Sequence, residues 1–345
     1  MVAEASGRKV RNGNYRKCSI DYYVHDAGLI WPADKKRSVF DLWCYVLNHA
    51  AKLGEAIRRE EYAEAGHEIG RTAVWLFSFI AKLQDPNKKG EDSLFYTATP
   101  LSEMIWAKYP NCCPVCYEHL VAIPRLKGKR DVKEWNGEIK KCRCILRSEA
   151  VERRKEEEKK FSKDKRDEIR RLRREYARRF KPKDPKIYSL DSLEEMFFNV
   201  FEPAITLLQP ESIGFHFLEE VGEVSEALTR LYTFKDEKEA TQELYELRKL
   251  EVENEIADVF SWLFAVSNKL RLIYKKVDRS PERLYPGIEI NLPQYAPEMS
   301  VSKRIWAEYK TRQGGFGCRL CGNLTCRCEI FLATEKKAIN KLLGH

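Results

Sequence analysis

The sequence predicts an all-α fold built as a tandem pair of helical bundles. Apolar residues recur at three- and four-residue spacing along most of the chain, and the alternation that is typical of strands is scarce. Several segments also occur twice in the same order, which indicates an internal duplication. The length of 345 residues is enough for two or three domains.

Two pairs of segments carry the duplication. EIGRTAVWLFSFIAKL at 68–83 resembles EIADVFSWLFAVSNKL at 255–270, and IWAKY at 105–109 matches IWAEY at 305–309. Each pentapeptide is followed by a C-x-x-C pair and then by a C-x-C pair. Because all these features agree in one order, we interpret the chain as two copies of one unit.

Helical periodicity predicts where each copy forms its helices. In the first copy, residues 38–60 and 65–83 should form a helical pair. In the second copy, Ser192 and Glu195 form a capping-box pattern, which predicts the start of a helix. The helices expected in that copy cover residues 191–208, 213–233, 237–247 and 249–274.

The positive charge of the chain lies between the two copies. Residues 147–183 hold 17 Lys and Arg against nine Asp and Glu, a net charge of +8 out of +9 for the whole chain. Good helix formers predict a long exposed helix here, docked by its C-terminal half. The segment is either a spacer with a solvated surface or a basic arm that holds nucleic acid or nucleotide phosphate. The apolar stripe that would dock it is Ile169, Leu172, Tyr176 and Phe180.

Neither a membrane span nor a secretory signal is indicated. The chain has no run of about 18 apolar residues. Its first residues, MVAEASGRKVRNGNYRK, lack the apolar stretch of a secretory signal. We therefore expect a cytoplasmic protein without a membrane partner.

Eight of the eleven cysteines form two similar sets. In a reducing compartment such sets indicate metal binding rather than disulfides. Each set supplies four thiolates, enough for a closed, structural zinc site, and the prediction is two Zn²⁺ per chain. A redox pair and buried free thiols are the alternatives. The expected zinc ligands are Cys113, Cys116, Cys142 and Cys144 in the first copy and Cys318, Cys321, Cys326 and Cys328 in the second.

Two pairs of acids lie within apolar helical stretches of the second copy. Glu220 and Glu223 are three residues apart and share a helix face, as do Glu255 and Asp258. A charge at Asp258, set in IADVFSWLFAV, is costly to bury unless it is paired or binds a metal. Four facing carboxylates would repel one another, and a hard divalent ion such as Mg²⁺ or Mn²⁺ would relieve that repulsion. The alternative is that they are surface acids paired with basic residues.

These acids and their apolar neighbours resemble the MazG-like all-α nucleoside triphosphate pyrophosphohydrolases. The likeness covers about residues 213–273, including LEEVGEVSEAL and EIADVFSWLFAVSNKL. The interval of 31 residues between Glu223 and Glu255 is longer than is usual in that family. We expect the insert to extend the helices or to add one.

The resemblance implies a reaction in which water attacks the α-phosphorus of a (deoxy)nucleoside triphosphate and yields monophosphate and pyrophosphate. A bound metal would neutralise phosphate charge and lower the pKa of the water. The acids expected to act in catalysis are Glu219, Glu220 and Glu223, and those expected to hold Mg²⁺ or Mn²⁺ are Glu220, Glu223, Glu255 and Asp258. The residues expected to contact substrate are Arg230, Asn268, Lys269 and Trp262, the last being either a core residue or a stacking platform for the base.

The first copy has lost the acid cluster. Alignment of the copies places Asn48, His49 and Lys52 at the positions of Glu219, Glu220 and Glu223. It also places Arg71 at the position of Asp258. Lys52 and Arg71 could neutralise the retained acid, Glu68, without a metal. Because the resembled family works as dimers or higher assemblies, the first copy would be a permanent partner in an intramolecular pseudo-dimer, which could assemble further.

Two functions of different classes follow. The first is the enzyme described above. The second is a zinc-stapled helical scaffold that binds nucleic acid through 147–183 or senses nucleotides without turnover. The expected division of the chain is an irregular segment at 1–35, a degenerate MazG-like domain at 36–104, a zinc module at 105–146, a charged helical linker at 147–187, a catalytic MazG-like domain at 188–300, and a second zinc module with a C-terminal helix at 301–345.

Overall fold

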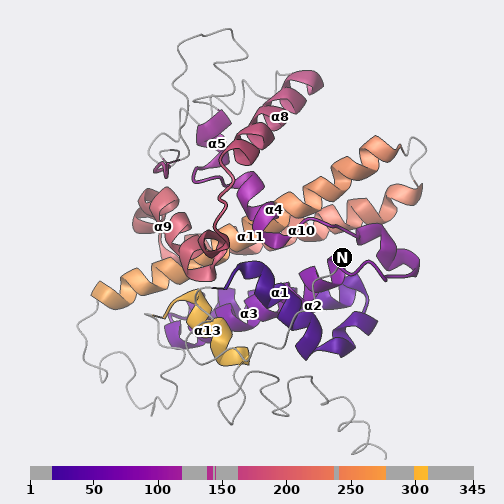
Figure 1. Ribbon diagram of the computed structural model, residues 1–345. Helices are drawn as coiled ribbons and strands as arrows, with labels where there is room; N and C mark the ends of the chain where they lie inside the picture. Colours follow the sequence, from indigo (N-terminus) through magenta and orange to yellow (C-terminus); the bar gives the residue numbers. More distant parts are fainter. Residues whose placement is uncertain are drawn as a thin grey trace, which may run out of the picture.

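The described part of the chain is helical. The computed structural model describes residues 18–118, 138–142, 144, 162–236, 241–276 and 299–309, and every regular element in these ranges is a helix, which confirms the all-α class (Figure 1). None of the helices in these ranges is long and apolar enough to cross a membrane.

Along the chain, a charged helix, α8 (Lys163–Arg179), separates the helices of the first copy from those of the second. The first copy contributes α1 (Ile20–Ile30), α2 (Val39–Arg58), α3 (Tyr62–Leu83), α4 (Leu101–Lys108), α5 (Pro114–Tyr117) and the 3₁₀ helices η2 (Pro32–Lys36) and η3 (Gly90–Phe95). The second copy contributes α9 (Leu190–Leu207), α10 (Pro210–Thr233), α11 (Gln242–Lys276) and α13 (Val301–Tyr309), with the 3₁₀ helices η6 (Pro185–Tyr188) and η7 (Phe234–Asp236).

Three boundaries differ from the sequence prediction. The segment expected to be irregular contains α1, whose N-cap Ser19 accepts a hydrogen bond from the amide of Asp21. Helix α9 is capped by Ser189, three residues before the predicted Ser192, since the hydroxyl of Ser189 already accepts from the amide at 192. The stretches expected as separate helices at 237–247 and 249–274 lie in one helix, α11, from Gln242 onward, because no Gly or Pro interrupts its helix-forming residues. The insert therefore extends a helix.

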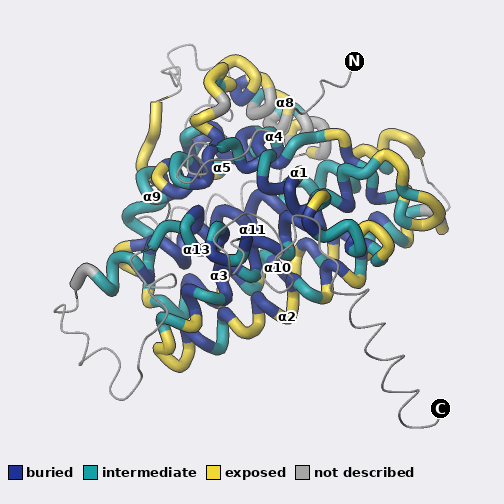
Figure 2. Tube along the Cα trace, turned by 60° about the horizontal axis from the view of Figure 1, so that its bottom comes forward, coloured by how far each residue is buried: buried dark blue, intermediate teal, exposed yellow. Residues whose placement is uncertain are grey.

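The two copies share one hydrophobic core. Helix α2 packs on α3 and α10 packs on α11, and α2 also packs on α10, so the pairs form a single layered body rather than two separate bundles (Figure 1). Buried residues run continuously through α2, α3, α10 and α11 (Figure 2). At the join, Trp43 of α2 donates a hydrogen bond from Nε1 to Ser225 Oγ of α10 at 2.7 Å.

The short helices that carry the IWA-[KE]-Y motifs are exchanged between the copies. Helix α4 of the first copy packs on α11 of the second, whereas α13 of the second packs on α3 of the first. The N-termini of these helices are held alike: Asp21 accepts from the amide of Ser102 at 2.9 Å, and Asp191 accepts from the hydroxyl of Ser302. A bridge between Ser19 and Ser189 joins the starts of α1 and α9. These matched contacts support the inferred duplication and add α1 to the first copy as the counterpart of α9.

The charged helix α8 docks by its C-terminal half, as its apolar stripe predicted. Tyr176 and Ala177 are buried, and Trp106 of α4 donates from Nε1 to the carbonyl of Ala177 at 2.8 Å. Tyr117 of α5 stacks on Tyr176 with ring centroids 4.7 Å apart. Helix α8 therefore rests on the first copy's α4–α5 region.

Gly70 of α3 sets how closely α13 approaches, and its substitution tests the exchanged packing. A Cβ at this position would lie 3.0 Å from the backbone oxygen of Arg304. Gly70→Ala should therefore lower the free energy of unfolding by about 1–3 kcal/mol, the usual cost of overpacking. The measurement is urea-induced unfolding followed by circular dichroism.

Gly222→Ala is the matched control for that experiment. Its Cβ would meet nothing within 4 Å, and alanine is the better helix former, so the free energy of unfolding should rise by about 0.5–1 kcal/mol. Equal behaviour of the two variants would contradict the close contact of α13 with α3.

Candidate metal centres

The predicted acids meet where α10 and α11 lie side by side. Glu220, Glu255 and Asp258 each place a carboxylate oxygen within 4.8 Å of the others. Glu223 is exposed, and its side chain hydrogen-bonds with Glu255. We call Glu220, Glu223, Glu255 and Asp258 the acid cluster; they are the four acids that the sequence analysis named as Mg²⁺ ligands.

Carboxyl groups in the acid cluster are costly to charge together. Burial, reinforced by the charges of Asp258 and Glu223, raises the pKa of Glu220 to about 8. Burial raises the pKa of Glu255 to about 7, although Lys108 opposes the shift. The Oε2 atom of Glu220 is buried and has no hydrogen-bond partner among the described residues. An oxygen-only set with an unpartnered buried oxygen suits a hard divalent cation.

Two residues of the first copy reach into the acid cluster. Helix α4 ends there, and Lys108 forms an ion pair with Oδ2 of Asp258 while its Nζ lies 4.0 Å from Glu255. The buried hydroxyl of Tyr109 donates to Oδ1 of the same aspartate. Sequence reasoning missed both residues. The signal that could have found Lys108 is the single charge difference between IWAKY and IWAEY.

An aromatic pair borders the acid cluster. Trp262 is half-buried and donates from Nε1 to Oε1 of Glu220 at 3.0 Å. Its ring stacks on the exposed His216, with centroids 4.7 Å apart. Trp262 is therefore a wall of this site as well as a packing residue.

Glu219 and Arg230, named as site residues from the sequence, lie outside the acid cluster. The side chain of Glu219 is 63% exposed and pairs with His216 at 3.1 Å, because it lies on the solvent side of α10. Arg230 forms ion pairs with Glu226 and Glu251. The structure thus places Glu219 outside the acid cluster and shows Arg230 engaged with Glu226 and Glu251, while their expected roles stay predictions.

Asn268 and Lys269 are also placed differently from the prediction. Asn268 is 4% exposed and donates to the carbonyl of Glu194 at 3.0 Å. Lys269 donates to the carbonyl of Ile205 at 3.0 Å, at the C-terminal end of α9. Both residues lie about ten residues beyond Asp258, or roughly 15 Å along a helix axis, so they hold α9 rather than line the cluster.

The equivalent position in the first copy is closed by side-chain pairing. His49 Nδ1 and Glu68 Oε2 lie 2.6 Å apart, both residues buried, and Arg71 is 3.4 Å from the same carboxylate. Burial alone would raise the pKa of Glu68, but His49 and Arg71 hold it below its usual range. The pairing with Arg71 follows the prediction, whereas His49 takes the place expected for Lys52, which is exposed. Glu64, His67 and Glu68 place ligand atoms within 4.8 Å of one another, although Glu68 is already engaged.

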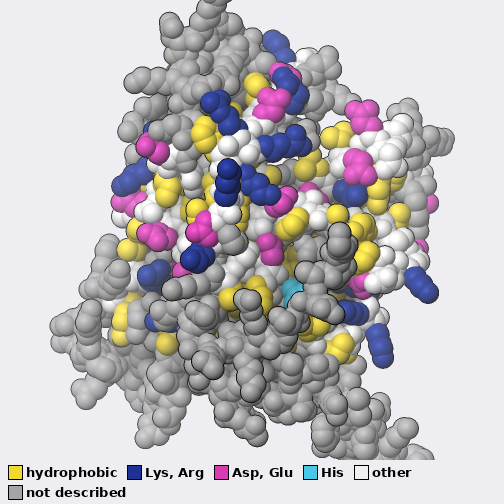
Figure 3. Space-filling model, viewed as in Figure 1, with side chains coloured by type: hydrophobic (Ala, Val, Ile, Leu, Met, Phe, Trp, Pro, Cys, Tyr) yellow, Lys and Arg dark blue, Asp and Glu magenta, His cyan; other side chains and the backbone are white. Residues whose placement is uncertain are grey.

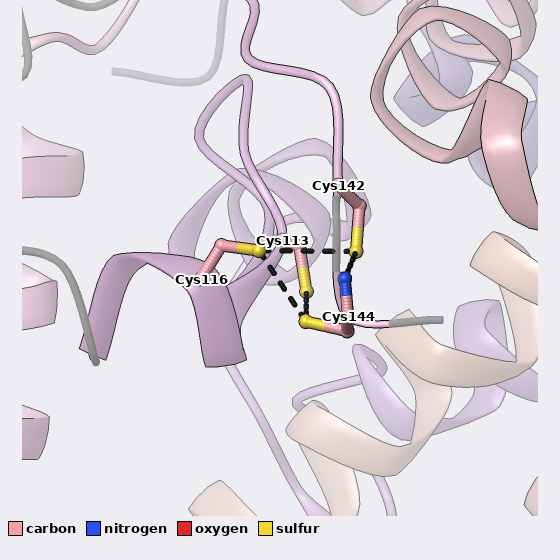
Figure 4. Close-up of side chains that lie close together, drawn as sticks. All are labelled: Cys113, Cys116, Cys142 and Cys144. Carbon is pink, nitrogen blue, oxygen red and sulfur yellow. Dashed lines mark hydrogen bonds between the residues drawn. The ribbon is translucent and has the colours of Figure 1, made fainter. Parts of the chain in front are cut away.

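The first cysteine set converges on one point (Figure 4). Cys113 and Cys116 flank the start of α5, and Cys142 and Cys144 approach from an extended segment, with all four sulfur atoms directed inward. The Sγ atoms of Cys116 and Cys142 are 3.8 Å apart, and those of Cys113 and Cys144 are 3.9 Å apart. A tetrahedral zinc site with bonds of 2.3 Å has sulfur atoms about 3.8 Å apart. This set could hold a metal ion such as zinc; the second set lies outside the described residues.

The first cysteine set also joins the two copies. The amide of Cys142 donates to the carbonyl of Val200 in α9 at 2.5 Å, and Lys141 pairs with Glu202 at 3.0 Å. Tyr109, four residues before Cys113, packs its ring on Phe197 of α9. A metal held by these thiolates would therefore fix the wall of α9 and Tyr109 next to the acid cluster.

Comparison with protein-family models, with curated proteins and with solved structures finds no match for this chain.

Removing one thiolate from the first cysteine set should remove one metal ion. We expect the intact chain to carry two zinc ions and Cys142→Ser to carry one, with a lower melting temperature, because three thiolates hold zinc less tightly. Elemental analysis and thermal unfolding measure both effects. The control is Cys44→Ser, since Cys44 is exposed on α2 and should leave zinc content unchanged. Equal zinc content in all three proteins would contradict the assignment.

The raised pKa values predict how stability varies with pH when no divalent ion occupies the acid cluster. Between the ordinary value of 4.5 and values of about 8 and 7, the folded state holds protons on Glu220 and Glu255 that the unfolded chain has lost. The contribution of these two groups to the free energy of unfolding should therefore be largest below about pH 4.5. It should fall as pH rises towards about 8.

Glu220→Gln should flatten that pH dependence, because an amide does not titrate. Glu246→Gln is the control, since Glu246 is exposed at the start of α11, and it should keep the wild-type slope. Urea unfolding at several pH values between about 5.5 and 8.5 gives the comparison. An unchanged slope in Glu220→Gln would contradict the raised pKa of Glu220.

Proposed function

We propose that this chain is a Mg²⁺-dependent nucleoside triphosphate pyrophosphohydrolase with one catalytic centre, at the acid cluster. The convergence of Glu220, Glu255 and Asp258 between α10 and α11, with the exposed Glu223 beside Glu255, carries the proposal. A scaffold does not need this arrangement, because partly buried acids with raised pKa values lower the free energy of unfolding. Groups with such pKa values are typical of functional sites. The MazG-like spacing of the same four residues supplies the reaction class.

Mg²⁺ or Mn²⁺ fits the acid cluster by the chemistry of its donors. Glu220, Glu223, Glu255 and Asp258 offer only carboxylate oxygens, and Oε2 of Glu220 has no hydrogen-bond partner among the described residues. When bound, the metal would neutralise phosphate charge and lower the pKa of the attacking water. The remaining roles fall to the chain's own groups.

Glu223 is the acid we assign to take the proton from water. It is exposed, so water can reach it, and it lies beside Glu255. Trp262 with His216 offers an aromatic surface next to Glu220, on which the base of a nucleotide would stack. The first copy serves as a permanent partner, and the cysteine sets hold structural zinc. We place the reaction in the cytoplasm, where thiols stay reduced.

Binding of nucleic acid by the basic segment is the second candidate function. On the face shown in Figure 3, Lys and Arg side chains gather over the upper part of the molecule, where α8 lies. Two of the described cations are paired locally: Arg171 with Glu168 and Glu175, and Lys181 with Glu103. We therefore rank this function below the enzyme. Salt-dependent retention of RNA or DNA by the full chain would favour it.

Turnover tests the proposed function directly. With Mg²⁺ and a panel of canonical and modified nucleoside triphosphates, the wild type should release pyrophosphate from at least one of them. Glu220→Gln and Asp258→Asn should each lower the rate by at least about 100-fold, because outer-shell partners of a metal already cost 10–100-fold when lost.

Glu246→Gln, which removes an exposed acid from the same helix as Asp258, is the control and should keep the wild-type rate. Failure of the wild type to cleave any nucleotide would overturn the proposed function. Equal rates in all four proteins would overturn the assignment of the site.

A further inference from the structure

Lys108 and Glu308 stand at equivalent positions in the two repeats and meet opposite partners. Because α4 and α13 are exchanged, Lys108 of IWAKY lies against the acid cluster of the second copy. Glu308 of IWAEY lies against the first copy, with Oε1 3.4 Å from Nε2 of His67. The charge at this position is therefore opposite to that of the site which each exchanged helix faces. A lysine at 108 is matched to the acid cluster in the same way that Glu308 is matched to His67.

Lys108 and Tyr109 together occupy both oxygens of Asp258. The ammonium of Lys108 pairs with Oδ2, and the hydroxyl of Tyr109 donates to Oδ1. Each oxygen keeps a second lone pair, so a divalent ion has access to either one. At Oδ2 the ion would compete directly with the Lys108 ammonium, and at Oδ1 it would still lie close enough to repel that ammonium strongly.

A displaced Lys108 ammonium must find another anion nearby. Its side chain is 14% exposed, and its remaining contacts are the carbonyl of Asn254 at 3.3 Å and Oε2 of Glu255 at 4.0 Å. Glu255 is itself one of the proposed metal ligands, so its charge would be shared with the metal. A partly buried ammonium without an anionic partner is costly. The nearest anion that arrives together with the metal is the phosphate chain of the substrate, and lysine binds phosphate as a compact, flexible charge.

We propose that Lys108, supplied by the first copy, is the internal counter-ion of the acid cluster, is displaced from Asp258 by the divalent metal, and then binds the phosphate chain of the substrate. This inference rests on the proposed function, because it needs a metal in the acid cluster. It gives the first copy, whose own acid position is closed, a direct part in the chemistry of the second.

Metal and phosphate binding should respond in opposite directions to the loss of Lys108. In Lys108→Met, Mn²⁺ alone should bind about tenfold more tightly, because a competing cation is gone. Pyrophosphate in the presence of saturating Mn²⁺ should bind about tenfold more weakly, the loss expected for one charge-assisted contact. Electron paramagnetic resonance of free Mn²⁺ and calorimetry measure the two affinities.

Lys36→Met is the matched control, because Lys36 is an exposed lysine of the same copy at the end of η2, outside the acid cluster and the cysteine set, and both affinities should stay at wild-type values. Parallel weakening of both affinities in Lys108→Met would show a merely structural role and overturn the inference, as would no change in either. If Mn²⁺ does not bind the wild type, the proposed function fails together with this inference. If Mn²⁺ binds the wild type but Lys108→Met lacks the expected effects, this inference alone fails.

The wild-type protein offers a test that needs no variant. Acetylation of Lys108, followed by mass spectrometry, should speed up when Mn²⁺ is added and slow down again when pyrophosphate joins it, while Lys36 reacts at a constant rate. A rate at Lys108 that ignores Mn²⁺ would overturn the inference.

Discussion

Repulsion among the carboxyl groups between α10 and α11 is the constraint on which the rest of the arrangement depends. Three acids in one partly buried place, with the exposed Glu223 beside them, need positive charge, and the chain brings it through Lys108 at the end of α4. Lys108 can reach these acids because α4, a helix of the first copy, packs on α11 of the second. The reciprocal packing of α13 on α3 and the single shared core follow from the same exchange.

The two copies have diverged in how they treat one equivalent position. In the first copy, His49 and Arg71 satisfy Glu68 with side chains, so no further charge is needed. In the second, Glu220 keeps a buried oxygen without a partner among the described residues, and its pKa is raised to about 8. Under the proposed function, this contrast favours the second copy as the place of the chemistry. The first copy, through α4 and the cysteine set that holds α9, supplies part of the wall and one cation.

Sequence predicted what depends on local pattern, and missed what depends on packing between distant segments. Three-residue spacing placed Glu220 with Glu223 on one helix face and Glu255 with Asp258 on another, because helix geometry fixes which residues share a face. The resemblance did not indicate that Asn268 and Lys269 bond to carbonyls of α9, because those contacts depend on packing between distant segments. The exchange of α4 and α13 is hard to predict from local sequence. The two helices differ in charge at one equivalent position, Lys108 against Glu308, and that difference indicates the exchange only once it is known which helix faces which site.

A crystal structure with Mn²⁺ and a non-hydrolysable nucleoside triphosphate analogue would test the central claim most directly. Anomalous scattering should place Mn²⁺ among Glu220, Glu223, Glu255 and Asp258, with Lys108 moved from Asp258 to the phosphate chain. Manganese bound elsewhere, or an acid cluster that keeps the Lys108–Asp258 ion pair and holds no metal, would contradict the account.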